Sequence, residues 1–247
     1  MRDFVFFTII SDNYYYDEGT PLFINSFKRF HPEIDLVVFR QDTIDKVFKE
    51  KNINFYMAKP TFAKLLTPYY RGVCNIDADH IVLARLEEII KGDYDIAAPI
   101  NKNDYENRAV ENITEDMFLQ GGMVASTRPK FWDIWEEHNA NAMNYPCREN
   151  DIMNLVIYNH PIVKNMNLKI LDKDKDYYGC KSLGREKECY MEGDKVMLRK
   201  EQMYLYHNAR GGKFPKLQFK KLGFKKEVTD FMNGLGGYGK SVRYSAF

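Results

Sequence analysis

The sequence predicts an α/β fold with a central, mostly parallel mixed sheet that is flanked by helices. The first observation is a strand-helix-strand succession over residues 4–39, typical of parallel strands joined by a right-handed crossover. The second is an apolar run over residues 73–83 that is interrupted by two aspartates one residue apart, as in a buried strand that carries carboxylates at its C-terminal end. The third is the length of 247 residues, which suits one domain with a sizeable core.

The N-terminal elements are the clearest. Residues 4–10 are β-branched or aromatic throughout, which predicts a strand buried on both faces, and residues 11–13 have turn chemistry. Residues 18–30 form one apolar helical face with Pro21 near the start, and residues 34–39 form the next strand.

Shorter elements are expected up to the aspartates. We expect a helix at 43–51, a short strand at 54–57 and a helix that begins at Pro60. The side chains that this helix directs into the core are expected to be Phe62, Leu65, Leu66 and Tyr69.

Beyond the aspartates we expect a short helix at 86–90 and a strand at 95–100, followed by a polar loop over the site at 101–116. A strand pattern at 117–125 contains Gly121-Gly122, which indicates either a β-bulge or a close approach of the backbone to a ligand.

The C-terminal half starts with two helices, at 129–143 and 149–158. Residues 169–188 are charged and rich in turn formers, so we expect an irregular excursion. A last clear strand at 203–207 leads into a polar, glycine-rich loop at 208–213.

Composition excludes several classes of protein. A formal net charge of +1 argues against a nucleic-acid partner. No apolar run approaches the ~18 residues of a membrane span, no signal peptide precedes the first strand, and the four cysteines are scattered. We therefore expect a cytoplasmic protein with reduced thiols.

Asp77 and Asp79 are the first candidates for chemistry. Carboxylates at the C-terminal end of a central strand suit Mg²⁺ or Mn²⁺ bound to a diphosphate. Aspartate also favours turns and helix N-caps, so the triplet alone does not decide between the two interpretations.

The motifs together resemble a known family. They are Asp77-Ala78-Asp79, the Gly121-Gly122 strand, the helix start Glu149-Asn150-Asp151, and a strand that ends in His207 six residues before Lys213. In order and spacing the chain resembles GT-A glycosyltransferases, especially the glycogenin and lipopolysaccharide galactosyltransferase group. The resemblance implies a single GT-A (Rossmann-like) domain over residues 1–213.

The resemblance also implies a metal site. The matching ligands are Asp77, Asp79 and His207, and the ion is Mn²⁺ (or Mg²⁺) bridging the phosphates of a nucleotide-sugar donor, most simply a UDP-sugar. Imidazole is a poor ligand for Mg²⁺ and an acceptable one for Mn²⁺, so the mixed set favours manganese.

Donor binding is carried over in the same way. The residues implied to contact the donor are Thr8, Ile9, Ile10, Tyr15, Lys64, Ala78, Gly122, Arg210, Gly212 and Lys213, together with the two aspartates. Tyr14 is an equal candidate for stacking on the base. Arg210 departs from the family pattern, which has glycine there, and Phe214-Pro215 replaces the family's Pro-Trp.

The catalytic candidates are Gln120, Glu149, Asn150 and Asp151. Gln120 offers amide hydrogen bonds to sugar hydroxyls, and Asp151 is the first choice to hold the sugar or stabilise an oxocarbenium-like centre. Acidic residues and Asn are also favoured at helix N-termini, so capping is the alternative for 149–151. The family retains anomeric configuration, but a carboxylate base here would equally suit an inverting enzyme.

The acceptor is expected to be a glycan, a lipid-linked molecule or a protein. Residues 214–247 form a basic segment with interspersed aromatics, which either packs on the same domain or makes peripheral contact with an anionic membrane. Two alternatives to glycosyl transfer stay open: a nucleotidyltransferase of sugar phosphates, and a non-catalytic carbohydrate-binding protein on the same fold.

Overall fold

The structure is a computed structural model. It describes residues 2–10, 16–48, 55–100, 113–114, 116–140, 149–171, 185–207 and 222–236. No described helix combines the length and apolar character needed to cross a membrane.

A six-stranded mixed sheet forms the centre of the molecule, with the strand order β2-β1-β3-β6-β5-β7. The strands are β1 (Arg2–Ile9), β2 (Asp35–Phe39), β3 (Tyr70–Ile76), β5 (Ile96–Pro99), β6 (Met123–Ser126) and β7 (Leu168–Leu171). Only β6 runs antiparallel to its neighbours, β3 and β5. The α/β class and the mostly parallel mixed sheet are therefore confirmed.

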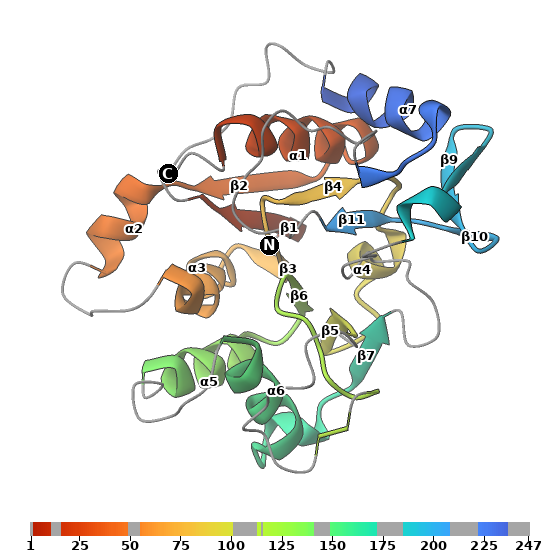
Figure 1. Ribbon diagram of the computed structural model, residues 1–247. Coiled ribbons are helices and arrows are strands. Elements are labelled where there is room, and N and C mark those ends of the chain that lie inside the picture. The colour runs from red at the N-terminus through yellow and green to blue at the C-terminus, as the bar shows by residue number, and fades with distance from the viewer. Residues whose placement is uncertain are drawn as a thin grey trace.

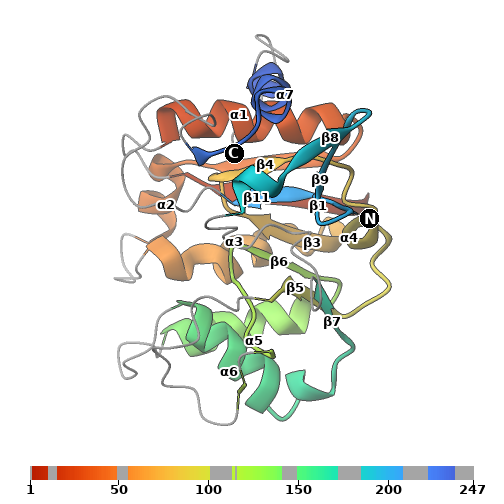
Figure 2. The ribbon, with the colours of Figure 1, turned by 45° about the vertical axis from the view of Figure 1, so that its right-hand side comes forward.

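Helices cover both faces of the sheet (Figures 1 and 2). One face is covered by α1 (Tyr16–Phe30) and α4 (Glu87–Lys91), the other by α2 (Gln41–Phe48), α3 (Lys59–Leu66), α5 (Pro129–Ala140) and α6 (Glu149–Asn159). A further helix, α7 (Lys226–Gly236), packs on the outside of α1, where Asn25 Nδ2 donates to the Gly236 carbonyl (2.9 Å).

Strand β1 contributes to both layers of the core because its side chains alternate between the two faces. Phe6 packs with Phe27 of α1, whereas Phe7 packs with Phe39 on the opposite face. All its residues from Phe4 to Ile9 are buried, as a strand covered by helices on both sides requires.

Two small sheets accompany the main one. Strand β4 (His80–Val82) pairs antiparallel with β11 (Leu205–His207). Strands β8 (Tyr190–Glu192), β9 (Lys195–Leu198) and β10 (Glu201–Gln202) form an antiparallel meander. The described residues also include the 3₁₀ turns η1 (Phe55–Ala58), η4 (Val163–Asn165) and η5 (Glu186–Glu188).

Four expectations about local structure are wrong. Residues 55–58 form a 3₁₀ turn, not a strand, because this turn leads directly into α3, which has proline in its first turn. In α3 the buried face is set by Phe62 and Leu66, so Leu65 (49% exposed) faces solvent, and Tyr69 (65% exposed) lies beyond the end of the helix. The strand expected at 117–125 begins only at Met123.

The fourth error is the irregular excursion expected from residue 169, where β7 instead pairs parallel with β5 at the edge of the sheet. An edge strand that is only half buried tolerates polar residues such as Lys169, which hides the strand pattern. Most of the polar loop expected at 101–116 lies outside the described residues.

Candidate active site

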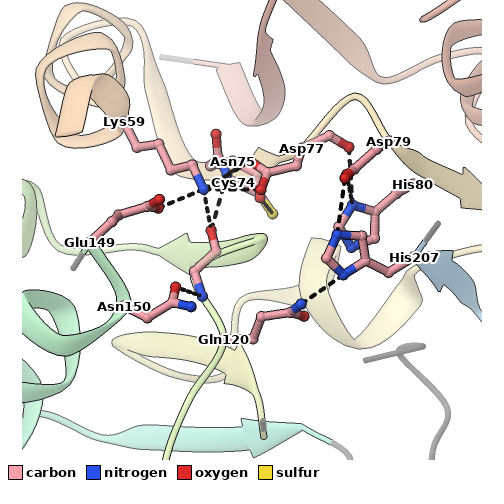
Figure 3. A network of polar contacts seen from close by, with 11 residues as sticks. Lys59, Cys74, Asn75, Asp77, Asp79, His80, Gln120, Glu149, Asn150 and His207 are labelled. Atoms are coloured by element: carbon pink, nitrogen blue, oxygen red, sulfur yellow. Dashed lines mark hydrogen bonds and ion pairs between the residues drawn. The ribbon is translucent and has the colours of Figure 1, made fainter. Parts of the chain in front are cut away.

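The pairing of β4 with β11 brings together residues that are distant in sequence. Strand β4 starts immediately after Asp79, and its first residue, His80, is the direct cross-strand partner of His207. Opposed residues of an antiparallel pair project on the same side. As a result His207 Nε2 lies 3.1 Å from Asp79 Oδ2, although the two residues are 128 positions apart (Figure 3).

The two imidazoles form a parallel stack beside the Asp79 carboxylate. Their ring centroids are 4.2 Å apart and the ring planes differ by 8°. The Gln120 side-chain amide is hydrogen-bonded to Nδ1 of His207 (2.7 Å). Burial, assisted by the neighbouring His207, lowers the pKa of His80. Burial would raise the pKa of Asp79, but the two histidines outweigh it and hold that pKa well below its usual value.

A second cluster is centred on Lys59, whose side chain is only 7% exposed. Its ammonium group lies 2.6 Å from Glu149 Oε1 and 2.9 Å from Asp77 Oδ1, and it donates to the Gly121 carbonyl (2.8 Å). Burial alone would lower the pKa of Lys59, yet the two carboxylates raise it above its usual value. The lysine is therefore a buried cation that joins α3, the end of β3 and the start of α6.

Helix α6 holds the segment that carries Gln120. Asn150 Oδ1 accepts a hydrogen bond from the Gly121 amide (2.8 Å), and Asn154 pairs with both the amide and the carbonyl of Leu119 (2.8 Å each). A Cβ at Gly121 would lie 2.7 Å from Asn150 Oδ1. A side chain at this position would displace the Asn150 and Glu149 side chains, which approach the backbone of Gly121 closely.

The pKa of Glu149 is shifted toward neutral pH. Burial and the nearby Asp77 raise its pKa to about 7 in spite of Lys59. Because the folded protein then binds a proton more tightly than the unfolded chain, stability should fall as pH rises from about 4.5 to about 7 and stay level above that.

Glu149→Gln should remove this part of the pH dependence, which urea unfolding at ~pH 5 and ~pH 8 can measure. Glu88→Gln, at a glutamate whose side chain is 58% exposed, is the control and should leave the dependence as it is. An equal fall in stability for Glu149→Gln and the parent protein would contradict the assignment.

The described structure brings together most of the predicted site residues. Those in or directly beside the two clusters are Asp77, Ala78, Asp79, Gln120, Gly122, Glu149, Asn150 and His207. Thr8, Ile9 and Ile10 stand at the carboxyl end of β1, next to the end of β3. Asp151 is buried in α6 (5% exposed) and its catalytic role stays a prediction. Tyr14, Tyr15, Arg210, Gly212 and Lys213 lie outside the described residues.

Lys64 does not join these clusters. Its ammonium group pairs with Glu136 (2.5 Å) and Asp133 (3.3 Å) of α5. The basic residue that the structure puts beside Asp77 is Lys59, five positions earlier, which the sequence analysis missed. The sequence does contain a signal for its burial. Phe62, Ala63 and Leu66 follow Lys59 by three, four and seven residues, so Lys59 lies on the buried face of the helix.

The site has a donor set that fits a divalent ion. Asp79, His80 and His207 each offer a ligand atom, and these atoms lie within 4.8 Å of one another. Among the described residues, the buried Asp79 Oδ1 has no hydrogen-bond partner and its nearest ring nitrogen, His80 Nδ1, is 3.4 Å away, so a lone pair is available for coordination. Carboxylate with imidazole suits Mn²⁺ or a later transition metal better than Mg²⁺.

Sequence comparisons give no relative: no protein-family model matches the chain, and no curated protein matches it. Comparison with solved structures, in contrast, finds proteins of similar fold. The galactosyltransferase LgtC, solved with donor and acceptor sugar analogues, is 13% identical with a TM-score of 0.57, over 96% of this chain and 97% of that one.

A glycosyltransferase involved in glycosylating the major capsid of PBCV-1 is 8% identical with a TM-score of 0.56, over 94% of this chain and 99% of that one. The bifunctional glycosyltransferase WbbM is also similar, at 16% identity and a TM-score of 0.48; 72% of this chain is matched, and it spans 40% of the length of WbbM. The chain therefore has the GT-A glycosyltransferase fold in one α/β domain, and it resembles the lipopolysaccharide galactosyltransferases in that fold.

Proposed function

We propose that the protein is a metal-dependent glycosyltransferase that moves a sugar from a UDP-sugar to a hydroxyl group of a glycan, lipid-linked or protein acceptor. The observation that carries the proposal is the meeting of Asp79 and His207 at 3.1 Å, next to the end of β3. Open α/β sheets bind ligands at the carboxyl ends of their strands. A carboxylate and an imidazole at this edge would suit a divalent ion that neutralises the charge of a diphosphate.

The ion, when bound, would neutralise charge that develops on the leaving diphosphate. Asp79 and His207 would hold it, with Gln120 fixing the orientation of the His207 ring. The Lys59 ammonium group contacts both Asp77 and Glu149, and its positive charge offsets the repulsion between these two carboxyl groups.

The carboxyl groups suggest how the donor sugar is held. Glu149, with a pKa of about 7, can both donate and accept hydrogen bonds to hydroxyls near neutral pH. Asn150 is engaged with the Gly121 amide and so orients the turn that carries Gln120. We expect Asp151 to support the sugar centre and the anomeric configuration to be retained.

The direct test is a panel of nucleotide-sugars incubated with the protein and Mn²⁺ without acceptor, since slow donor hydrolysis needs only the donor site. Release of UDP with free sugar from one donor, abolished by EDTA and restored by Mn²⁺, is the expected result. Adding pyrophosphate separates the alternatives, because a nucleotidyltransferase would then form UTP and a sugar 1-phosphate. Sugar binding without nucleotide or metal would contradict the proposal.

A further inference from the structure

The strand that follows Asp79 stands outside the main sheet. Strand β4 pairs with β11 in a two-stranded ribbon that is separate from the six-stranded sheet. Hydrogen bonding alternates along an antiparallel strand, and Leu83, one residue past β4, donates toward β11, to the Tyr204 carbonyl (2.9 Å). The amides of His80 and Val82 therefore point to the other edge. The contacts of that edge help to decide how the ribbon is placed.

Helix α1 meets this outer edge of β4 through Ser26 (Figure 1). Ser26 Oγ accepts a hydrogen bond from the Val82 amide (3.0 Å) and donates to the Phe23 carbonyl of its own helix (2.9 Å). Ser26 is 0% exposed, and Val82 packs in the same core cluster as Phe23 and Phe27. The hydroxyl therefore links a backbone carbonyl of α1 to a buried edge amide of β4.

His31, directly after α1, makes the same kind of link to a residue beyond β4. Its Nε2 atom accepts from the Leu86 amide (2.9 Å), and its Nδ1 atom lies 3.2 Å from the Phe27 carbonyl oxygen. An amide N–H only donates and a carbonyl only accepts, so the ring is neutral with its proton on Nδ1. Burial lowers the pKa of His31 to about 4, which agrees with a neutral ring.

These two side chains do more than fill the core. Both are polar and buried where an apolar side chain would satisfy packing, and each supplies the acceptor for a backbone amide of residues 80–86. That segment begins one residue after Asp79, and its first residue, His80, opposes His207 across the ribbon. A displacement of residues 80–86 would therefore change the distance between Asp79 and His207.

We propose that Ser26 and His31 are positioning residues of the candidate active site, which hold residues 80–86 against α1 and so keep Asp79 beside His207. The inference rests on the proposed function in taking Asp79 and His207 as ligands of the ion. Ser26 and His31 act through the backbone of the segment they hold. Their substitution should therefore change the local order of β4 and the affinity for metal.

Amide hydrogen exchange in the ¹⁵N-labelled protein tests the hold on β4. Ser26→Ala should speed exchange at Val82 by ~10-fold or more, because its amide loses its acceptor, while exchange at Phe6 in β1 stays as in the parent. Asn25→Ala is the matched control: it removes the hydrogen bond from α1 to Gly236 of α7 (2.9 Å) and should leave Val82 protected. Equal acceleration at Val82 and Phe6 in Ser26→Ala would be a general destabilisation and would overturn the inference.

The second experiment measures the binding of Mn²⁺ alone, by electron paramagnetic resonance of the free ion, at a temperature at which each variant is folded. Ser26→Ala should raise the Kd for Mn²⁺ by roughly 2–30-fold, the range for a substitution that acts through a packed network. His31→Leu should have a similar effect, and His31→Gln a smaller one, since its amide oxygen can accept from Leu86. Asn25→Ala should bind as the parent does. A Kd of Ser26→Ala equal to that of the parent, or an equal rise in Asn25→Ala, would overturn the inference.

Failure of this inference and failure of the proposed function give different results. If the parent hydrolyses a nucleotide-sugar and Ser26→Ala binds Mn²⁺ as the parent does, the inference fails and the function holds. If Ser26→Ala weakens Mn²⁺ binding but the parent processes no donor, the positioning role stands and the function fails. Absence of Mn²⁺ binding by the parent would overturn both.

Discussion

Lys59→Met should destabilise the protein by about 3–5 kcal/mol, because it removes the buried cation that pairs with the Glu149 carboxyl group and with the partly exposed Asp77 carboxylate. The lysine lies 2.6 Å from Glu149 and 2.9 Å from Asp77, and it is almost fully enclosed. Methionine fills a similar volume, so the loss is electrostatic and does not come from a cavity. Urea unfolding near neutral pH measures the effect.

The same helix supplies the control. Lys64 also pairs with two acidic residues, but its side chain is 37% exposed, so Lys64→Met should cost no more than about 1 kcal/mol. Adding Glu149→Gln to Lys59→Met should recover part of the lost stability above about pH 7, where Glu149 would otherwise carry a charge without its cation. Losses of similar size for Lys59→Met and Lys64→Met would contradict a buried ion-pair role for Lys59.

Asp79→Asn should lower Mn²⁺-dependent donor hydrolysis by more than ~100-fold, because the substitution removes the negative charge of a proposed metal ligand and keeps its shape. Loss of an outer-sphere partner already costs 10–100-fold, so an inner ligand should cost more. The reaction should recover in part at high Mn²⁺ concentration, since an amide oxygen still binds weakly. Steady-state kinetics over a range of Mn²⁺ concentrations measures both effects.

Asp42→Asn is the matched control, at an aspartate of α2 whose side chain is 69% exposed. It should leave kcat and the Mn²⁺ requirement unchanged. Full activity of Asp79→Asn at low Mn²⁺ would remove the carboxylate from the metal site and with it the main support for the proposed function.

The central elements could be predicted because the hydrophobic pattern of their residues indicates which of their faces are buried. Strand β1 is apolar on both faces, and its burial by helices on either side follows from that pattern. The β8–β10 meander could not be predicted, since its second turn uses Arg199 and Lys200 at positive φ (50° and 69°), where turn formers such as Asn or Gly are usual. The edge strand β7 was hidden for a similar reason: its partly exposed positions carry no apolar alternation.

The sequence by itself determined the α/β class, the two aspartates after a central strand, and the histidine that ends a later one. These are local patterns, so each could be read without knowing its neighbours. Only the tertiary structure decided that His80 faces His207, because strand register joins residues far apart in the chain. It also decided that Lys59, and not Lys64, pairs with Asp77, since a difference of five residues along one helix turns a side chain from the buried site to the neighbouring helix.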